Sequence, residues 1–224
     1  AGELLHTGKW PKEGADLRGK RVGIIGTGSS GVQAIPVIAR EAEHLTVFQR
    51  TPVYTFPANN KPLRDDVQTA YKEHYGDVRA RQRTSVAGFS GFKPFKPERA
   101  RPAEQSRPTD WAEPADVGDT AGAPRRPSRP EILGTTAEQR REMWEQQGFN
   151  SFNVYRDVYK DLDANELACE LFRDHVRSVV HDPESAEKLL PLDYPLGCKR
   201  QVIDTDYYET FNRPNVELVD LAAE

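Results

Sequence analysis

The stretch RVGIIGTGSSG, residues 21–31, joins a short apolar run to a glycine-rich turn. The run at its start is typical of a buried parallel strand. Apolar residues then follow at helical spacing as far as about residue 43: Val32, Ile35, Val37, Ile38 and Ala39. A second strand-like run, LTVFQ, occupies residues 45–49. Strand, turn, helix and strand in this order make a βαβ unit, so we expect an α/β fold with a parallel, Rossmann-like sheet.

The turn has the spacing G-x-G-x-x-G and reads Gly26-Thr27-Gly28-Ser29-Ser30-Gly31. In a dinucleotide site the first glycine permits the tight turn, the second lets a pyrophosphate approach the backbone, and the third lets the helix pack closely on the strand. The helix N-terminus offers free N–H groups and a partial positive charge to phosphates, and the serine hydroxyls add donors. A purely structural turn is the alternative. The strand before the motif and the helix after it favour a dinucleotide-binding domain.

The end of the second strand indicates which dinucleotide binds. It reads Gln49-Arg50-Thr51, whereas a site that prefers NAD usually has an acidic residue there for the adenosine ribose. Arg50 offers planar, permanently charged donors that suit a phosphate, and Thr51 offers a hydroxyl. Without the glycine motif, Arg50 would be interpreted as a solvated surface residue. Beside the motif, it predicts that NADP is preferred.

Composition excludes several classes of protein. The 224 residues include 31 Lys and Arg against 35 Asp and Glu, which argues against a nucleic-acid binder that depends on phosphate neutralisation. No apolar stretch approaches the roughly 18 residues of a membrane-spanning helix, so no membrane partner is expected. Cys169 and Cys198 are too few for a disulfide scaffold and are interpreted as reduced thiols of a cytoplasmic protein. No metal site is predicted, because no histidine pair stands at ligand spacing.

The two ends of the chain resemble a known family. The N-terminus reads Gly2-x-x-x-His6-x-x-x-Trp10-Pro11, which is similar to the fingerprint F-x-G-x-x-x-H-x-x-x-W-P of type I Baeyer–Villiger monooxygenases. The glycine turn, the run 46–52, the tetrapeptide 197–200 and the run DYYETFNR at 206–213 also look like that family, in the right order. The resemblance covers residues 1 to about 60 and 140 to 224.

This resemblance implies an FAD-dependent monooxygenase that uses NADPH and O₂ to insert an oxygen atom into ketones, giving esters or lactones. In that family an NADPH domain is inserted between two sequence segments of an FAD domain. The chain looks like this insert with short flanks, so FAD would be bound mainly by parts of the parent protein absent here. The implied partners are the ketone, O₂ and that FAD domain, and the chain alone is expected to be inactive.

The resemblance also implies roles for individual residues. The dinucleotide turn corresponds to Gly26, Thr27, Gly28, Ser29, Ser30, Gly31 and Gln33. Arg50, Thr51 and Lys199 correspond to residues that bind the 2′-phosphate of NADPH. Arg200 corresponds to the catalytic arginine, whose charge stabilises negative charge that develops during oxygen insertion. Gly2, His6 and Trp10 correspond to fingerprint residues, and the resemblance implies that His6 and Trp10 couple domain motion to catalysis. From spacing alone, Lys199-Arg200 would be a solvated basic pair and His6 a structural histidine.

The expected organisation follows from these motifs and from a change of composition in the middle of the chain. Between residues 94 and 130 there are 8 prolines in 37 residues, a stretch that cannot bury enough apolar surface to offset chain entropy. The absence of an initial methionine suggests a piece of a longer chain. The expected parts are a linker with the fingerprint (1–20), the first βαβ unit (21–62), a helical segment (63–93), a mobile Pro-rich insertion (94–134), a helical part with the return of the NADPH-binding domain (135–200), and the start of a return to the FAD domain (201–224).

Three other functions stay open. A simple NADP dehydrogenase would need its own proton donor, and no Tyr-x-x-x-Lys motif or histidine constellation is evident. An N- or S-oxygenating flavin monooxygenase is a closer alternative, although Trp10-Pro11 favours the Baeyer–Villiger class. A non-catalytic NADP-binding module would bind the nucleotide with no catalytic need for Arg200.

Overall fold

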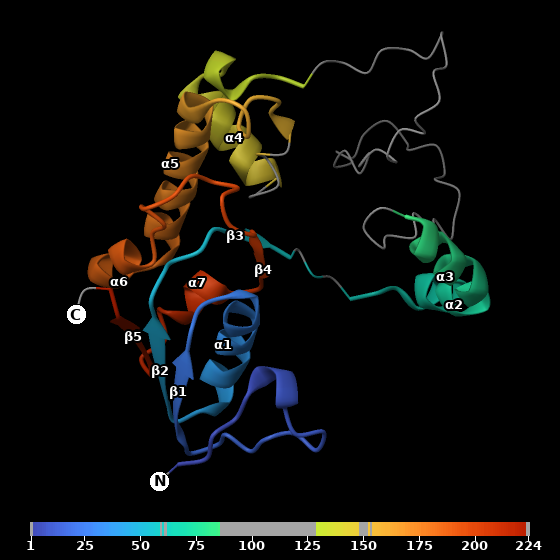
Figure 1. The fold of residues 1–224 in the computed structure, drawn as a ribbon, viewed down its shortest axis with the longest axis vertical. Helices are drawn as coiled ribbons and strands as arrows, with labels where there is room; N and C mark the ends of the chain where they lie inside the picture. Colours follow the sequence, from blue (N-terminus) through green and yellow to red (C-terminus); the bar gives the residue numbers. More distant parts are fainter. Residues whose placement is uncertain are drawn as a thin grey trace. The chain divides into compact units, whose positions relative to one another are not determined.

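The computed structural model describes residues 2–58, 60, 62–85, 129–147, 152 and 154–222. The chain divides into two compact units. The larger unit joins Ala1–Asn59 to Ser128–Glu224, and the smaller unit is Asn60–Pro127. All the described strands belong to the larger unit (Figure 1).

Three parallel strands form the main sheet in the order β1-β2-β5. They are β1 (Arg21–Ile25), β2 (His44–Gln49) and β5 (Val216–Asp220). In the middle of β2, Val47 pairs with Ile24 on one side and with Leu218 on the other. Leu45 and Val47 are fully buried, as expected for the central strand of such a sheet. The expectation of an α/β fold with a parallel sheet is confirmed.

Helix α1 (Ser29–Glu41) packs against β1 and β2 through fully buried side chains that include Val32, Ile35 and Ala39. The helix ends two residues before the predicted position. The Asn215 side-chain amide donates to the carbonyl oxygens of Ala39 and Ala42, each at 3.0 Å. These two bonds, which come from the loop before β5, satisfy carbonyl groups at the end of the helix, where the helix itself leaves them unpaired.

Two further parallel strands, β3 (Thr55–Pro57) and β4 (Val202–Asp204), pair in a second sheet. Helix α7 (Tyr207–Thr210) follows β4 and contacts α1. The motifs predict that residues 201–224 are the start of the return to the FAD domain. The structure differs, because β4 and β5 complete the two sheets of the larger unit and Tyr207 and Tyr208 are buried in its core.

The remaining helices agree with the local sequence signals. In the larger unit they are α4 (Ala137–Gln147), α5 (Leu162–Val179) and α6 (Pro183–Lys188), with short 3₁₀ helices at Thr7–Lys9 and Ile132–Gly134; the smaller unit holds α2 (Asp65–Glu73) and α3 (Tyr75–Thr84). Asp161 and Asp182 cap α5 and α6, and Thr136 exchanges hydrogen bonds with Gln139 at the start of α4. Among these described helices none is long and apolar enough to cross a membrane.

Most of the predicted insertion, from residue 94 to 128, lies outside the described residues. Its predicted end at 134 is too late. Ile132 is fully buried in the core, and the carboxylate of Asp157 accepts the backbone N–H groups of Ile132 at 2.9 Å and Leu133 at 3.2 Å. One large apolar side chain and one buried acceptor thus bring the chain back into the core before the predicted residue 135.

We expect Asp157→Ala to lower the free energy of unfolding by about 2–4 kcal/mol, because two backbone donors in a buried region would lose a charged acceptor. Asp174→Ala is the matched control, since among the described residues its exposed carboxylate pairs only with Arg177, a contact worth below about 1 kcal/mol. Chemical denaturation of both variants measures the difference. Equal losses in the two would contradict the assigned role of Asp157.

Candidate functional site

A hollow of about 570 Å³ lies beside the glycine-rich turn. It opens where β1 and β2 end and α1 begins, the position at which parallel α/β sheets bind their ligands. Its lining includes Gly26, Thr27, Gly28, Arg50, Thr51 and Lys199. The structure therefore brings together six of the residues that the sequence analysis selected, although Lys199 is distant from the others along the chain.

Each glycine of the turn has its own geometry. Gly26 has φ +96°, a conformation that side chains rarely adopt, and its N–H donates to the carbonyl oxygen of Phe48 at 2.9 Å. A Cβ added at Gly28 would meet no atom within 4 Å, so the backbone there is open to the hollow. A Cβ added at Gly31 would lie 2.2 Å from the Gly26 carbonyl oxygen. These geometries match the roles expected for the three glycines in a dinucleotide turn.

The start of α1 offers unused donors. Gly28 is the N-cap residue and has no side chain with which to cap the N–H groups of the first turn. Ser29 and Ser30 are exposed in this turn. Gln33 lies one turn further along, and its amide donates to the Ile203 carbonyl oxygen at 3.5 Å rather than lining the hollow.

The turn is also tied to the end of β2, because the Thr27 hydroxyl donates to the Thr51 carbonyl oxygen at 3.1 Å. Arg50 and Lys199 line the hollow and make no ion pair among the described residues. Two cations without a carboxylate partner, beside an open helix N-terminus, form an anion-binding arrangement. Arg200 is exposed in the same loop as Lys199 but does not line the hollow.

The N-terminal residues lie apart from this hollow. The His6 Nδ1 atom accepts the N–H of Gly8 at 3.0 Å and thereby caps the 3₁₀ helix Thr7–Lys9. Trp10 is 38% exposed, and Gly2 is exposed as well. None of the three lines the hollow. Among the described residues there is also no group of His, Cys, Asp or Glu that could hold a metal ion.

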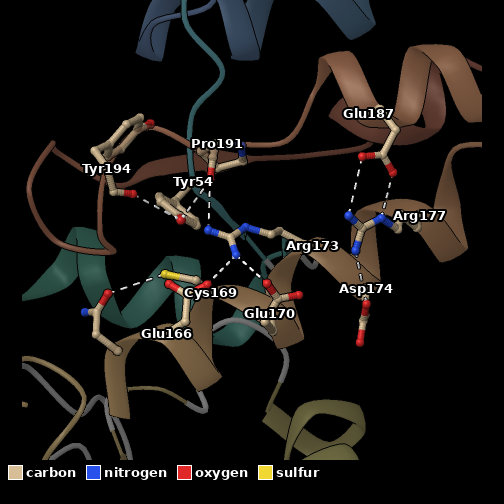
Figure 2. A network of polar contacts seen from close by, with 11 residues as sticks. Tyr54, Glu166, Cys169, Glu170, Arg173, Asp174, Arg177, Glu187, Pro191 and Tyr194 are labelled. Atoms are coloured by element: carbon tan, nitrogen blue, oxygen red, sulfur yellow. Dashed lines mark hydrogen bonds and ion pairs between the residues drawn. The ribbon is translucent and has the colours of Figure 1, made fainter. Parts of the chain in front are cut away.

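A polar network around Arg173 was not predicted from the sequence (Figure 2). Arg173 of α5 is buried and pairs with Glu166 at 2.6 Å and Glu170 at 2.5 Å. Burial lowers the pKa of Arg173, but the hydrogen bonds with the two carboxylates outweigh it and raise the pKa overall. The guanidinium also donates to the Pro191 carbonyl oxygen at 3.5 Å, which connects α5 to the segment before Lys199.

Tyr54 and Asn165 form hydrogen bonds with the backbone of that segment. The Tyr54 hydroxyl donates to the carbonyl oxygens of Pro191 at 3.1 Å and Tyr194 at 3.3 Å (Figure 2). The Asn165 amide nitrogen donates to the Leu196 carbonyl oxygen at 2.9 Å, and its oxygen accepts the Leu196 N–H at 2.9 Å. Periodicity does not reveal such contacts, since each joins residues far apart in the chain.

Comparisons with known proteins agree with this geometry. A Baeyer–Villiger monooxygenase of Pseudooceanicola batsensis is 38% identical to this chain over 100% of the chain and 35% of that protein. The phenazine N-monooxygenase PhzNO1 of Lysobacter antibioticus is 34% identical over 98% of the chain and 35% of its own length. The solved structure of an oxidized steroid monooxygenase bound to NADP has a TM-score of 0.69 and 37% identity, and covers 99% of this chain and 37% of that one.

No protein-family model matches the chain. The chain spans about a third of the length of these relatives. The likeness extends over nearly the whole chain, and with the strand order and the glycine turn it identifies a Rossmann-like dinucleotide-binding fold.

The turn generates a stability prediction with a built-in control. Gly31→Ala should lower the free energy of unfolding by about 1–3 kcal/mol, because the added methyl group meets a backbone carbonyl that cannot yield without moving α1. Gly28→Ala should cost less than about 1 kcal/mol, since the space beside it is open. Thermal unfolding followed by circular dichroism compares the two. A larger loss for Gly28→Ala would refute the assignment of the third glycine to helix packing.

Proposed function

We propose that this chain, which is homologous to a segment of the type I Baeyer–Villiger monooxygenases, is the NADPH-binding part of an FAD-dependent monooxygenase. In the proposed reaction the full-length enzyme inserts one oxygen atom from O₂ into a ketone and so gives an ester or a lactone. One observation carries the proposal. The open backbone at Gly28 and the unpaired cations Arg50 and Lys199 line the same hollow. A pyrophosphate and a 2′-phosphate require these two kinds of donor at one site.

Two groups of residues would bind different parts of the nucleotide. Gly26, Gly28 and the first turn of α1, with Ser29 and Ser30, would hold the pyrophosphate. Arg50, Thr51 and Lys199 would hold the 2′-phosphate, where the arginine supplies planar bidentate donors and the lysine a point charge. Bound NADPH supplies the hydride that reduces the flavin. The Thr27 hydroxyl keeps the end of β2 against the turn, so that the two groups of donors stay in register.

Arg200 is the proposed catalytic residue of the parent enzyme. It is exposed in the loop that carries Lys199, and no carboxylate pairs with it among the described residues. A cation without a partner can stabilise negative charge that develops on the substrate side, and it needs no reorganisation to do so. The fingerprint residues Gly2, His6 and Trp10 have the proposed role of coupling domain motion to this step.

The proposed partners lie outside the chain. They are the FAD domain of the same protein, with its flavin, a ketone and O₂. We further propose a cytoplasmic location, because both cysteines are free thiols, one of them exposed. Residues 1–20 would serve as the linker to the FAD domain.

Oxygenation of an aromatic ring nitrogen is a second candidate, favoured by the 34% identity to a phenazine N-monooxygenase. The two reactions differ in the atom that is oxygenated. The full-length enzyme, given cyclic ketones and phenazines in parallel, distinguishes them by mass spectrometry of the products. Lactone formation supports the first proposal, and N-oxide formation alone supports the second.

The chain should bind NADPH more tightly than NADH. Each charge-assisted hydrogen bond to the 2′-phosphate is worth about 1.5–3 kcal/mol, so Arg50 and Lys199 together favour NADPH by about a hundredfold or more. Arg50→Ala should remove at least about tenfold of this preference. Calorimetric titration of both nucleotides measures it, and equal affinity for the two in the unaltered chain would overturn the proposal.

In the full-length enzyme Arg200→Ala should abolish ester formation while reduction of the flavin by NADPH persists. Loss of a preorganised group that stabilises charge typically costs about 10²–10³ in rate. The substitution Lys199→Ala, at the neighbouring residue, should instead weaken NADPH binding and leave oxygenation intact at saturating nucleotide. Product yield measured beside anaerobic flavin reduction separates the roles. Normal ester yield with loosened NADPH in Arg200→Ala would assign Arg200 to phosphate binding instead.

A further inference from the structure

Tyr194 contacts both the segment that follows β2 and the Lys199 side chain, the two parts of the proposed phosphate site. Its hydroxyl donates to the Pro52 carbonyl oxygen at 2.6 Å, directly after the Arg50-Thr51 pair. The Lys199 ammonium lies 4.0 Å from the centroid of its ring. No periodic pattern links Lys199 to the end of β2, yet this one side chain spans the two.

Tyr194 is itself held firmly. Its ring lies edge-on to the Tyr54 ring, with centroids 5.5 Å apart and planes at 86°. Its backbone oxygen accepts the Tyr54 hydroxyl (Figure 2). Tyr54 in turn packs against Phe172 of α5, with centroids 5.0 Å apart. Burial raises the pKa of Tyr194 to about 12, so the phenol stays protonated and keeps donating to Pro52 at neutral pH.

An aromatic ring holds an ammonium group differently from a carboxylate. The ring attracts the cation through its quadrupole and leaves the positive charge unneutralised. A lysine held in this way loses less side-chain entropy when it meets an anion, because part of its freedom is already restricted. The Lys199 charge is therefore both restrained and available at the hollow.

We infer that Tyr194 is a specificity-determining positioning residue, which holds Lys199 beside Arg50 and Thr51 and so sets the preference for a 2′-phosphorylated nucleotide. The inference rests on the proposed function and adds a residue to it. Tyr194 acts through Lys199, so its effect appears in the ratio of the affinities for NADPH and NADH, and it depends on the lysine.

The experiment titrates NADPH and NADH against the 224-residue chain and its variants. Tyr194→Leu should weaken NADPH by about three- to tenfold and change NADH by less than about twofold. Tyr159→Phe is the control, since this tyrosine hydroxyl accepts from Gln201 and, among the described residues, the ring over which Lys199 lies is that of Tyr194. It should leave the ratio of affinities unchanged.

A double-mutant cycle tests the dependence on the lysine. In a Lys199→Ala background, Tyr194→Leu should no longer alter the ratio of the NADPH affinity to the NADH affinity. A full additional effect in that background, or equal weakening of both nucleotides by Tyr194→Leu, would overturn the inference. A chain without any preference for NADPH would overturn the proposed function and the inference with it. Loss of the preference in Lys199→Ala but not in Tyr194→Leu overturns the inference alone.

A second pair of variants applies if Tyr194→Leu does not fold, as thermal unfolding will tell. Tyr194→Phe keeps the ring, and replacement of Tyr194 by trifluorophenylalanine keeps the ring shape but withdraws electron density from its face. The ratio of the NADPH affinity to the NADH affinity should be about threefold lower in the fluorinated chain than in the phenylalanine chain. Equal ratios in these two chains would show that the ring does not act on the Lys199 charge.

Discussion

Helix α1 starts so close to the turn after β1 that a Cβ at position 31 would lie 2.2 Å from the carbonyl oxygen of Gly26. Only a glycine permits this approach, and the approach places the N-terminus of the helix next to Gly28, which lines the hollow, whereas Ser29, Ser30 and Gly31 do not line it. The same turn is linked to β2 through the N–H of Gly26 and the hydroxyl of Thr27. Helix, turn and strand therefore form one rigid element.

The rest of the site depends on β2 as the central strand. Its flanks are β1, which is near in sequence, and β5, which comes from the end of the chain. Because all three strands are parallel, their carboxyl ends meet at one edge, where Arg50 and Thr51 follow β2. The late strand β5 thus supports a hollow whose glycine-rich turn comes from the beginning of the chain.

Support for the other half comes from α5. Arg173 is buried and pairs with two exposed carboxylates, and together with Tyr54 and Asn165 it fixes the segment that carries Tyr194 and Lys199. Its Nε atom has no partner among the described residues. The carboxylates of Glu166 and Glu170 are more than half exposed, so these pairs contribute little net stability, because solvent screens their attraction. Their effect here is geometric, since they hold one backbone path in place.

The local sequence determined the βαβ unit, the helix caps and the glycine roles, because strand and helix periodicity and turn chemistry act between residues close in the chain. It also selected six of the ten residues that line the hollow, in part through a family resemblance. Only the tertiary structure showed that β4 and β5 belong to the sheets, that Ile132 is buried, that Gln33 and Arg200 do not line the hollow, and that Lys199 lies over the Tyr194 ring. Strand partners and aromatic contacts between distant residues leave no periodic trace, since they depend on how the whole chain packs.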